Sequence, residues 1–294
     1  MYFVINFNKL ERQVFPDGMS FRKIDWSEYE PFDCTINASI TSYSDLIELD
    51  LLLKTRIEDN YTFRPDHITL HYIIGSRMDR QIDGDYSMPN VCRTVCDVIK
   101  SWNIPIKLVW PHSTSLLDRL DCVESYKSIN FVRDGLTWFN SIGFNKFAIA
   151  TPDAGMNKRW WNDLSKGIYS DCGDFSVIEC GKHREVTTGR LSGFSCPNEV
   201  PENIIILDDL CDGGGTFSGL ASELRKHGAK NIGLMVYHGI FSKGYPDLID
   251  YVYTTNSYYC SDSETMRSRI IENTSSGHRF ISDHINNLSI VEVI

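Results

Sequence analysis

The chain has 294 residues, of which 42% are hydrophobic, so it is long enough for one large or two smaller α/β domains with a full core. Its formal net charge of −10 argues against nonspecific nucleic-acid binding, and it contains neither an apolar run long enough to span a membrane nor an N-terminal secretory signal. The nine scattered cysteines form no CxxC pair, which favours the reduced thiols of a cytoplasmic protein over disulfides or a zinc site.

In the first half of the chain, strands are predicted to alternate with helices. Strands are expected at residues 2–7, after a turn at residues 15–18, at residues 68–74 and at residues 107–110. Ser44 is expected to cap a helix, because apolar residues recur after it at helical spacing. The apolar face of this helix is expected to hold Leu46, Ile47, Leu51 and Leu52. A further helix is expected at residues 87–102.

The second half continues the same alternation. A helix around residues 136–139 precedes a strand that runs into an acidic loop at Asp153, and later strands are expected within 232–241, 251–259 and 288–294. Polar residues follow the predicted strand ends, where open α/β sheets bind their ligands. These residues are His112, Asp153, Asp208 and Asp212. Each alone is more often an ordinary surface or core residue, but their repeated position favours a ligand site in an α/β protein.

Residues 204–216, IIILDDLCDGGGT, are the most informative stretch of the chain. Four apolar residues predict a short buried strand, which an acidic pair follows directly. A third aspartate and three glycines then lead into an amphipathic helix, whose expected end is Gly228. Glycines let backbone N–H groups approach an anion, and the helix N-terminus adds its positive end, so this pattern predicts a phosphate site. Glycines alone would also fit tight packing, but carboxylates beside a phosphate site indicate bound ribose hydroxyls or a divalent metal.

This loop resembles the ribose-phosphate loop of type I phosphoribosyltransferases and of ribose-phosphate diphosphokinases, which are also called PRPP synthetases. The diphosphokinases are the better match, because their other motifs follow in the same order between about residues 14 and 257. These motifs are FPDGM at 15–19, RMDRQ at 77–81, WPHS at 110–113, TPDAG at 151–155, KHR at 182–184 and YHGIFS at 237–242. The resemblance implies two phosphoribosyltransferase-like domains, expected at residues 1–132 and 133–294. Each would be a mainly parallel sheet flanked by helices, and the last strand could return to the first domain.

The resemblance implies transfer of the β,γ-diphosphate of ATP to the anomeric 1-hydroxyl of a 5-phosphorylated ribose, with release of AMP. Lys182 and Arg184, which alone would indicate only a solvated basic turn, are expected to stabilise the transferred charge. His112 and Asp153 are expected to help hold Mg²⁺. The residues expected at the ATP site are Phe15, Asp17, Gly18, Met19, Arg77, Met78 and Asp79. Those expected to bind the ribose phosphate are Asp208, Asp209, Asp212, Gly213, Gly214, Gly215 and Thr216.

Some positions depart from the family pattern. Met19 replaces a glutamate, Met78 replaces a glutamine, and Gly213 replaces a threonine whose hydroxyl helps bind a free 5-phosphate. Losing that hydroxyl weakens phosphate binding by about 1 kcal/mol and makes room for an esterified 5-phosphate. ADP-ribose is therefore our expected acceptor, as in a phage-type branch that serves NAD⁺ salvage, and ribose 5-phosphate is the alternative. Trp160, Trp161 or Phe217 could stack on a second adenine, whereas core packing is the expected role of at least one of the tryptophans.

The family resemblance also implies partners and a location. A homo-oligomer, at least a dimer, is expected, without nucleic-acid or membrane partners, in the cytoplasm or in the host cytoplasm of a phage. The short segments before residue 15 and after the last predicted strand indicate a compact member of the family. A non-catalytic regulatory homologue is disfavoured because Lys182, Arg184 and the loop aspartates are present. A phosphoribosyltransferase would need no ATP and would lack the other motifs.

Overall fold

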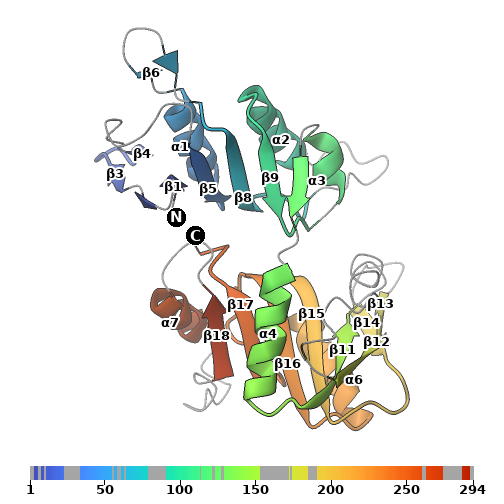
Figure 1. Ribbon diagram of the computed structural model, residues 1–294. Helices are drawn as coiled ribbons and strands as arrows, with labels where there is room; N and C mark the ends of the chain where they lie inside the picture. Colours follow the sequence, from blue (N-terminus) through green and yellow to red (C-terminus); the bar gives the residue numbers. More distant parts are fainter. Residues whose placement is uncertain are drawn as a thin grey trace. The chain divides into compact units, whose positions relative to one another are not determined.

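The chain folds into two compact units, which are shown in the computed structural model of Figure 1. The structure describes residues 3–5, 8–9, 11–22, 34–54, 56–57, 61–62, 64–78, 91–112, 114–120, 123–126, 129–152, 172, 174–184, 191–259, 263–273 and 287–291. Unit 1 comprises residues 1–127, 257–261 and 293–294, and unit 2 comprises residues 128–256 and 262–292. The expected domain boundary between residues 132 and 133 would cut helix α4, Ile129–Ser141, which lies wholly in unit 2.

Unit 1 is built on a six-stranded sheet. Its strand order is β10 (Val123–Tyr126), β9 (Ile106–Val109), β8 (His67–Ile73), β5 (Thr35–Ile40), β1 (Phe3–Ile5) and β2 (Asn8–Lys9). The first four strands are parallel, whereas β1 runs antiparallel to β5 and β2 antiparallel to β1. The helices are α1 (Tyr43–Leu53), α2 (Val91–Ser101) and α3 (Thr114–Arg119). Two small antiparallel hairpins join β3 (Arg12–Val14) to β4 (Ser20–Arg22) and β6 (Arg56–Ile57) to β7 (Tyr61–Thr62).

Helix α1 begins one residue after its N-cap, Ser42, and not after Ser44 as expected. The Ser42 hydroxyl accepts a hydrogen bond from the Asp45 backbone N–H at 3.2 Å, which satisfies a first-turn amide. Of the four residues predicted for the buried face, Leu46 and Leu52 are buried and the other two are not. Ile47 and Leu51 are 47% and 41% exposed, respectively. The residues of α1 that are buried are Asp45, Leu46, Glu48, Leu49, Leu52 and Leu53.

Unit 2 is built on a six-stranded sheet in which every neighbouring pair of strands is parallel. Its order is β12 (Asp174–Glu179), β11 (Lys146–Thr151), β15 (Asn203–Cys211), β16 (Asn231–Gly239), β17 (Tyr251–Thr255) and β18 (Leu288–Val291). Strands β13 (Gly181–Arg184) and β14 (Leu191–Ser195) form a separate antiparallel ribbon. Besides α4, the described helices of this unit are α6 (Gly215–Lys226) and α7 (Ser263–Asn273). The α/β class with mainly parallel sheets is thus confirmed.

The core of unit 2 depends on close approach between α4 and the sheet. Both faces of β15 and β16 are buried, which explains their nearly continuous apolar sequences. Phe139 of α4 is fully buried against Gly233 of β16, where a Cβ atom would lie only 2.2 Å from the aromatic ring. Glycine at this position therefore lets α4 lie directly on the sheet, as Figure 1 shows.

The last strand stays with unit 2. β18 pairs with β17 in parallel register, and the Asn256 backbone N–H donates to the carbonyl of Val291 at 3.0 Å. The return of the last strand to the first domain is therefore not seen for residues 288–291.

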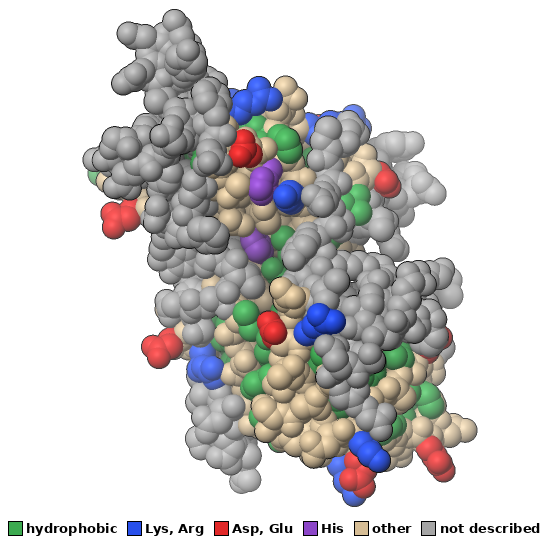
Figure 2. Space-filling view, viewed as in Figure 1, with side chains coloured by type: hydrophobic (Ala, Val, Ile, Leu, Met, Phe, Trp, Pro, Cys, Tyr) green, Lys and Arg blue, Asp and Glu red, His purple; other side chains and the backbone are tan. Residues whose placement is uncertain are grey.

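On the face shown in Figure 2, acidic and basic side chains of the described residues are interspersed. None of the described helices is long and apolar enough to cross a membrane.

Candidate active site

The predicted phosphate loop lies at the point where the strand order of the second sheet reverses direction. β11 and β15 are neighbours in the sheet. β12 lies on the outer side of β11, whereas β16, β17 and β18 follow one another on the outer side of β15. The carboxyl ends of β11 and β15 therefore flank a topological switch point, which is where open α/β sheets bind ligands. Residues 212–216 follow β15 at this edge. Asp153, which follows β11 in sequence, lies outside the described residues.

The loop itself is shaped by glycines. Gly214 is the N-cap of α6 with a φ of 74°, and a Cβ there would lie 3.0 Å from the Pro246 side chain, so a larger residue would be strained and crowded. A glycine N-cap has no side chain to accept from the first-turn amides, so these amides can serve an anion. A Cβ on Gly215 would meet none of the described atoms within 4 Å. The expected helix after the loop is confirmed, with Leu220 and Leu224 buried and Gly228 at φ 112° just past its end.

Lys182 lies against this loop. Its Nζ donates a hydrogen bond to the Thr216 hydroxyl at 3.0 Å, although 34 residues separate the two in sequence. Lys182 sits on β13, where its register partner on β14 is Phe194. The structure thus brings the predicted catalytic lysine to the predicted phosphate loop within one unit. Arg184 ends β13, and its side chain is outside the described residues.

Two cysteines bracket the β13–β14 ribbon. Cys180 directly precedes β13, and Cys196 directly follows β14. Burial, and secondarily the neighbouring Cys196, raise the pKa of Cys180 to about 12. Burial also raises the pKa of Cys196. Both groups are therefore thiols near neutral pH, which argues against a nucleophilic role, since the thiolate is the reactive form.

The acidic residues of the loop occupy different environments. The strand was expected to end at Leu207, but β15 continues through Cys211, so Asp208 and Asp209 lie within the strand. Asp209 is only 4% exposed, whereas Asp208 is half-buried and its carboxylate accepts from the Asp209 backbone N–H at 2.9 Å. Asp212 lies in the loop and accepts from the Ser242 hydroxyl at 2.5 Å. Asp208 and Asp212 are thus better exposed for ligand contact than Asp209.

A second lysine lines the loop at Gly213. If a Cβ atom is placed on Gly213, the three nearest atoms are Cγ, Cδ and Cε of Lys243, at 3.4–3.6 Å. These are ordinary van der Waals distances, so the Lys243 stem runs across Gly213 and the position tolerates a methyl group. The space beside Gly213 is therefore lined by a cationic side chain. Phe217, an expected stacking partner, is instead buried in α6, while Trp160 and Trp161 lie outside the described residues.

The FPDGM segment forms the tip of the β3–β4 hairpin in unit 1. The Gly18 N–H donates to the Phe15 carbonyl at 2.9 Å, the φ of Gly18 is 87°, and the Asp17 carboxylate accepts from the Met19 N–H at 3.0 Å. These bonds define a tight turn, in which Asp17 has a local structural role. Phe15 and Met19 are each 53% exposed, so both side chains are accessible to a ligand.

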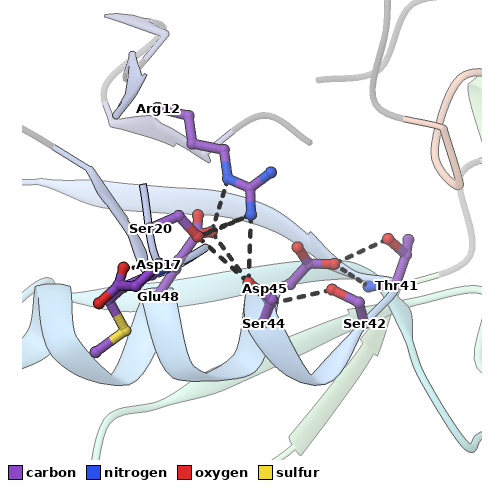
Figure 3. A network of polar contacts seen from close by, with 9 residues as sticks. Arg12, Asp17, Ser20, Thr41, Ser42, Ser44, Asp45 and Glu48 are labelled. Carbon is purple, nitrogen blue, oxygen red and sulfur yellow. Dashed lines mark hydrogen bonds and ion pairs between the residues drawn. The ribbon is translucent and has the colours of Figure 1, made fainter. Parts of the chain in front are cut away.

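A polar network fixes this hairpin to helix α1, as Figure 3 shows. Arg12 of β3 donates from Nε to Oε1 of Glu48 at 2.8 Å and from Nη2 to the Ser20 hydroxyl at 2.8 Å. Ser20 also donates to Glu48, and Ser44 lies beside both. Sequence reasoning missed this network, because Arg12 and Glu48 are 36 residues apart. The available signal was Glu48 itself, a charged residue on the buried face of an amphipathic helix.

The remaining expected site residues lie in unit 1 or outside the described residues. Arg77 and Met78 are exposed in the turn after β8, and His112 is half-buried just after β9. Asp79 and Asp153 are outside the described residues. Among the described residues, no three His, Cys, Asp or Glu side chains cluster as metal ligands. Mg²⁺ carried by nucleotide phosphates prefers oxygen and needs only one or two carboxylate ligands, so a site near Asp153 would not require such a cluster, and the roles of His112 and Asp153 stay predictions.

The sequence and fold of this chain resemble those of known ribose-phosphate pyrophosphokinases. No protein-family model matches the chain. Ribose-phosphate pyrophosphokinase of Mycoplasmopsis pulmonis is 29% identical over 233 residues, which cover 76% of this chain and 69% of the relative. The enzyme of the same name from Sulfolobus acidocaldarius is 27% identical over 241 residues, or 79% and 77% of the two chains. The crystal structure of phosphoribosylpyrophosphate synthetase from Mycobacterium smegmatis covers 97% of this chain and 86% of its own, with a TM-score of 0.65 and 19% identity.

Together, the parallel sheets and the glycine loop at the switch point place the protein in the phosphoribosyltransferase-like fold class. The two relatives named ribose-phosphate pyrophosphokinase match over most of this chain and over most of their own length. Within the fold class, they are the proteins that this chain resembles in sequence. Over most of its length the chain is similar to the ribose-phosphate pyrophosphokinases, or PRPP synthetases, and this likeness supports a diphosphotransferase enzyme.

Proposed function

We propose that this enzyme transfers the β,γ-diphosphate of ATP to the anomeric hydroxyl of ribose 5-phosphate, forming PRPP and AMP. The relatives named ribose-phosphate pyrophosphokinase support this acceptor more directly than the expected ADP-ribose. The observation that carries the proposal is the 3.0 Å hydrogen bond from Lys182 to Thr216. This bond connects the lysine of the KHR motif to the predicted phosphate loop. The loop follows β15 at the edge of the sheet where open α/β proteins bind ligands.

The proposed chemistry follows from the charges involved. The anomeric oxygen attacks the β-phosphorus, the bond from that phosphorus to the bridging oxygen of AMP breaks, and the hydroxyl proton is released. Because the transferred group is highly anionic, catalysis depends on positioning and on cations near the phosphoryl oxygens. Among the described residues, Lys182 contacts the phosphate loop and is proposed for this role. Arg184 lies two residues further along β13. Mg²⁺, which is expected with ATP, supplies further positive charge to the phosphates when bound.

The acceptor is proposed to bind along the loop after β15. The 5-phosphate would accept hydrogen bonds from amides at the start of α6 and from the Thr216 hydroxyl. Asp208 and Asp212 would accept hydrogen bonds from the ribose hydroxyls, because both carboxylates lie near the loop and Asp209 is more deeply buried. In unit 1, the exposed Phe15 and Met19 and the turn at Arg77 and Met78 are proposed for ATP.

A second acceptor, ADP-ribose, is favoured by one observation. Gly213 lacks the side chain that would restrict a 5-phosphate, and the Lys243 stem lines the space beside it. An esterified 5-phosphate occupies more room than a free one, and a second phosphate would gain from an added cation. The product would be ADP-ribose 1-diphosphate, a precursor for NAD⁺ synthesis.

A product assay tests the proposal. Purified protein is mixed with ATP, Mg²⁺ and either ribose 5-phosphate or ADP-ribose, and AMP and the diphosphorylated product are followed by mass. We expect AMP with ribose 5-phosphate, and its loss when a chelator removes Mg²⁺. AMP with ADP-ribose alone would establish the second acceptor. No AMP with either acceptor would favour a regulatory homologue without catalytic activity.

A further inference from the structure

The β13–β14 ribbon contacts helix α6 at two neighbouring points. At the first, the Lys182 Nζ donates to the Thr216 hydroxyl. At the second, the ring of Phe194 lies over Gly219. Lys182 and Phe194 are register partners across the ribbon, and Thr216 and Gly219 are three residues apart on one helix face. The two contacts therefore form a single docking surface, which we call the ribbon dock and define by Lys182, Phe194, Thr216 and Gly219.

The fit at Gly219 depends on the absence of a side chain. A Cβ atom on Gly219 would lie 2.3 Å from Cε2 of Phe194, and 3.1 and 3.2 Å from Cζ and Cδ2. Real carbon atoms do not approach this closely, so the ring occupies the place where a side chain would be. Glycine is a poor helix former, and Gly219 lies in the second turn of α6, away from either end. Helix stability alone would favour alanine here, so the glycine is explained by the packing of Phe194.

We infer that the Phe194–Gly219 contact positions Lys182 on the phosphate loop, an inference that rests on the proposed function. A two-stranded ribbon is only marginally stable by itself, so it needs an anchor to hold a side chain in place. The lysine side chain is long and flexible, and the location of its amine depends on where the ribbon backbone lies. Phe194 and Gly219 are thus positioning residues that act through Lys182.

Gly219→Ala is the central test, with Gly193→Ala as its matched control. Gly193 neighbours Phe194 on the same ribbon, but a Cβ there meets no atom of the described residues within 4 Å. We expect Gly219→Ala to lower kcat about 10- to 100-fold, as displacement of a catalytic group by about 1 Å can do. Its thermal midpoint should fall only modestly, because the helix preference for alanine offsets part of the packing lost at Phe194. Gly193→Ala should keep kcat within about twofold of the wild type.

Two double variants separate positioning from a general structural effect. Adding Phe194→Leu to Gly219→Ala removes the clashing ring atoms, so kcat should recover about threefold or more over Gly219→Ala alone. In a Lys182→Ala background, Gly219→Ala should cause little further loss, because both changes remove the same amine from the loop. Multiplicative losses in that background would overturn the inference.

A readout that needs no turnover keeps this inference separate from the proposed function. Lys182 can be labelled in the folded protein with a limiting amine acetylation reagent and quantified by peptide mass. Because the bonded amine is protected in the dock, Gly219→Ala should raise its labelling several-fold and Gly193→Ala should not. If the wild type releases no AMP but the labelling changes as described, the positioning stands and the proposed function fails. If the wild type is active and Gly219→Ala changes neither kcat nor labelling, the positioning is overturned.

Discussion

Arg12 and Glu48 form an ion pair, with Nη2 of the arginine 2.7 Å from Oε1 of a carboxylate whose side chain is 1% exposed. The arginine side chain is 42% exposed, so water reaches one end of the pair and not the other. Glu48 therefore depends on Arg12 and on the Ser20 hydroxyl for the interactions that water would otherwise provide. The pair ties the hairpin that carries the proposed ATP segment to the core of unit 1.

Arg12→Ala is expected to lower the free energy of unfolding by about 1–3 kcal/mol, because it leaves a buried carboxylate without its cation. The exposure of Arg12 keeps the expected loss below that of a fully buried pair. The KM for ATP should rise more than the KM for the acceptor, since the hairpin would lose its anchor. Urea unfolding and steady-state kinetics measure the two effects. Arg93→Ala, which breaks a 3.9 Å surface pair with Asp97, is the control and should cost under about 0.5 kcal/mol.

Lys182→Ala is expected to lower kcat about 100-fold or more, because it removes a cation from the transferred diphosphate. KM for the acceptor should change less, since the α6 amides and Thr216 remain. Lys226→Ala removes an exposed lysine from the last turn of α6 and provides the charge-matched control. Wild-type turnover in Lys182→Ala would show that this lysine is not catalytic.

Gly213→Thr is expected to shift the acceptor preference toward ribose 5-phosphate. The new hydroxyl can donate to a free 5-phosphate and add about 1 kcal/mol to its binding, or about fivefold in KM. The Lys243 stem leaves room for the added Cβ, so the fold should tolerate the change. The ratio of kcat/KM for ribose 5-phosphate and ADP-ribose is the measurement. Gly213→Ala, which adds the Cβ without the hydroxyl, controls for bulk, and an unchanged ratio in Gly213→Thr would contradict the proposed role of this position.

Stability is expected to fall at high pH, partly through Cys180. Burial favours the neutral thiol in the folded state and raises its pKa from 9.0 to about 12, while the unfolded chain loses this proton near pH 9. Between these values the folded state binds more protons than the unfolded state, so each pH unit costs up to about 1.4 kcal/mol. Cys180→Ala should flatten the decline of the thermal midpoint between about pH 9 and 10.5. An equally steep decline in this variant would show that other groups account for it.

Sequence periodicity predicted most strands and helices, because parallel strands are buried on both faces and produce recognisable apolar runs. It was less accurate where a polar residue is buried. The face of α1 was partly misjudged because Glu48 lies on its buried side, where Arg12, a residue far away in the sequence, and Ser20 stabilise the carboxylate. Likewise, the extent of β15 was underestimated, because the acidic pair looks like a loop, although Asp208 pairs with Val236 of β16 and the pairing continues through Cys211.

The motifs identified the residues of the candidate site but not their contacts. The sequence indicated Lys182 and Thr216 separately, and only the fold shows that they are hydrogen-bonded. Gly219 and Phe194 carry no motif, since a helical glycine and a strand phenylalanine are individually ordinary. Lys243 was also missed, because its proximity to Gly213 depends on how the loops after β15 and β16 meet. Such pairings arise from tertiary packing, which no local pattern encodes.

The assignment of residues 257–261 to unit 1 has a consequence for how the chain comes apart. The Ser39 hydroxyl donates to the carbonyl of Ser257, and Tyr72 packs edge-to-face on Tyr258 with centroids 4.9 Å apart. If the chain were cleaved between residues 127 and 128, the N-terminal fragment would lose its covalent link to residues 257–261. These residues complete unit 1 but would belong to the C-terminal fragment. Expressed alone, residues 1–127 would lack these partners, whereas the two fragments produced together should reassociate.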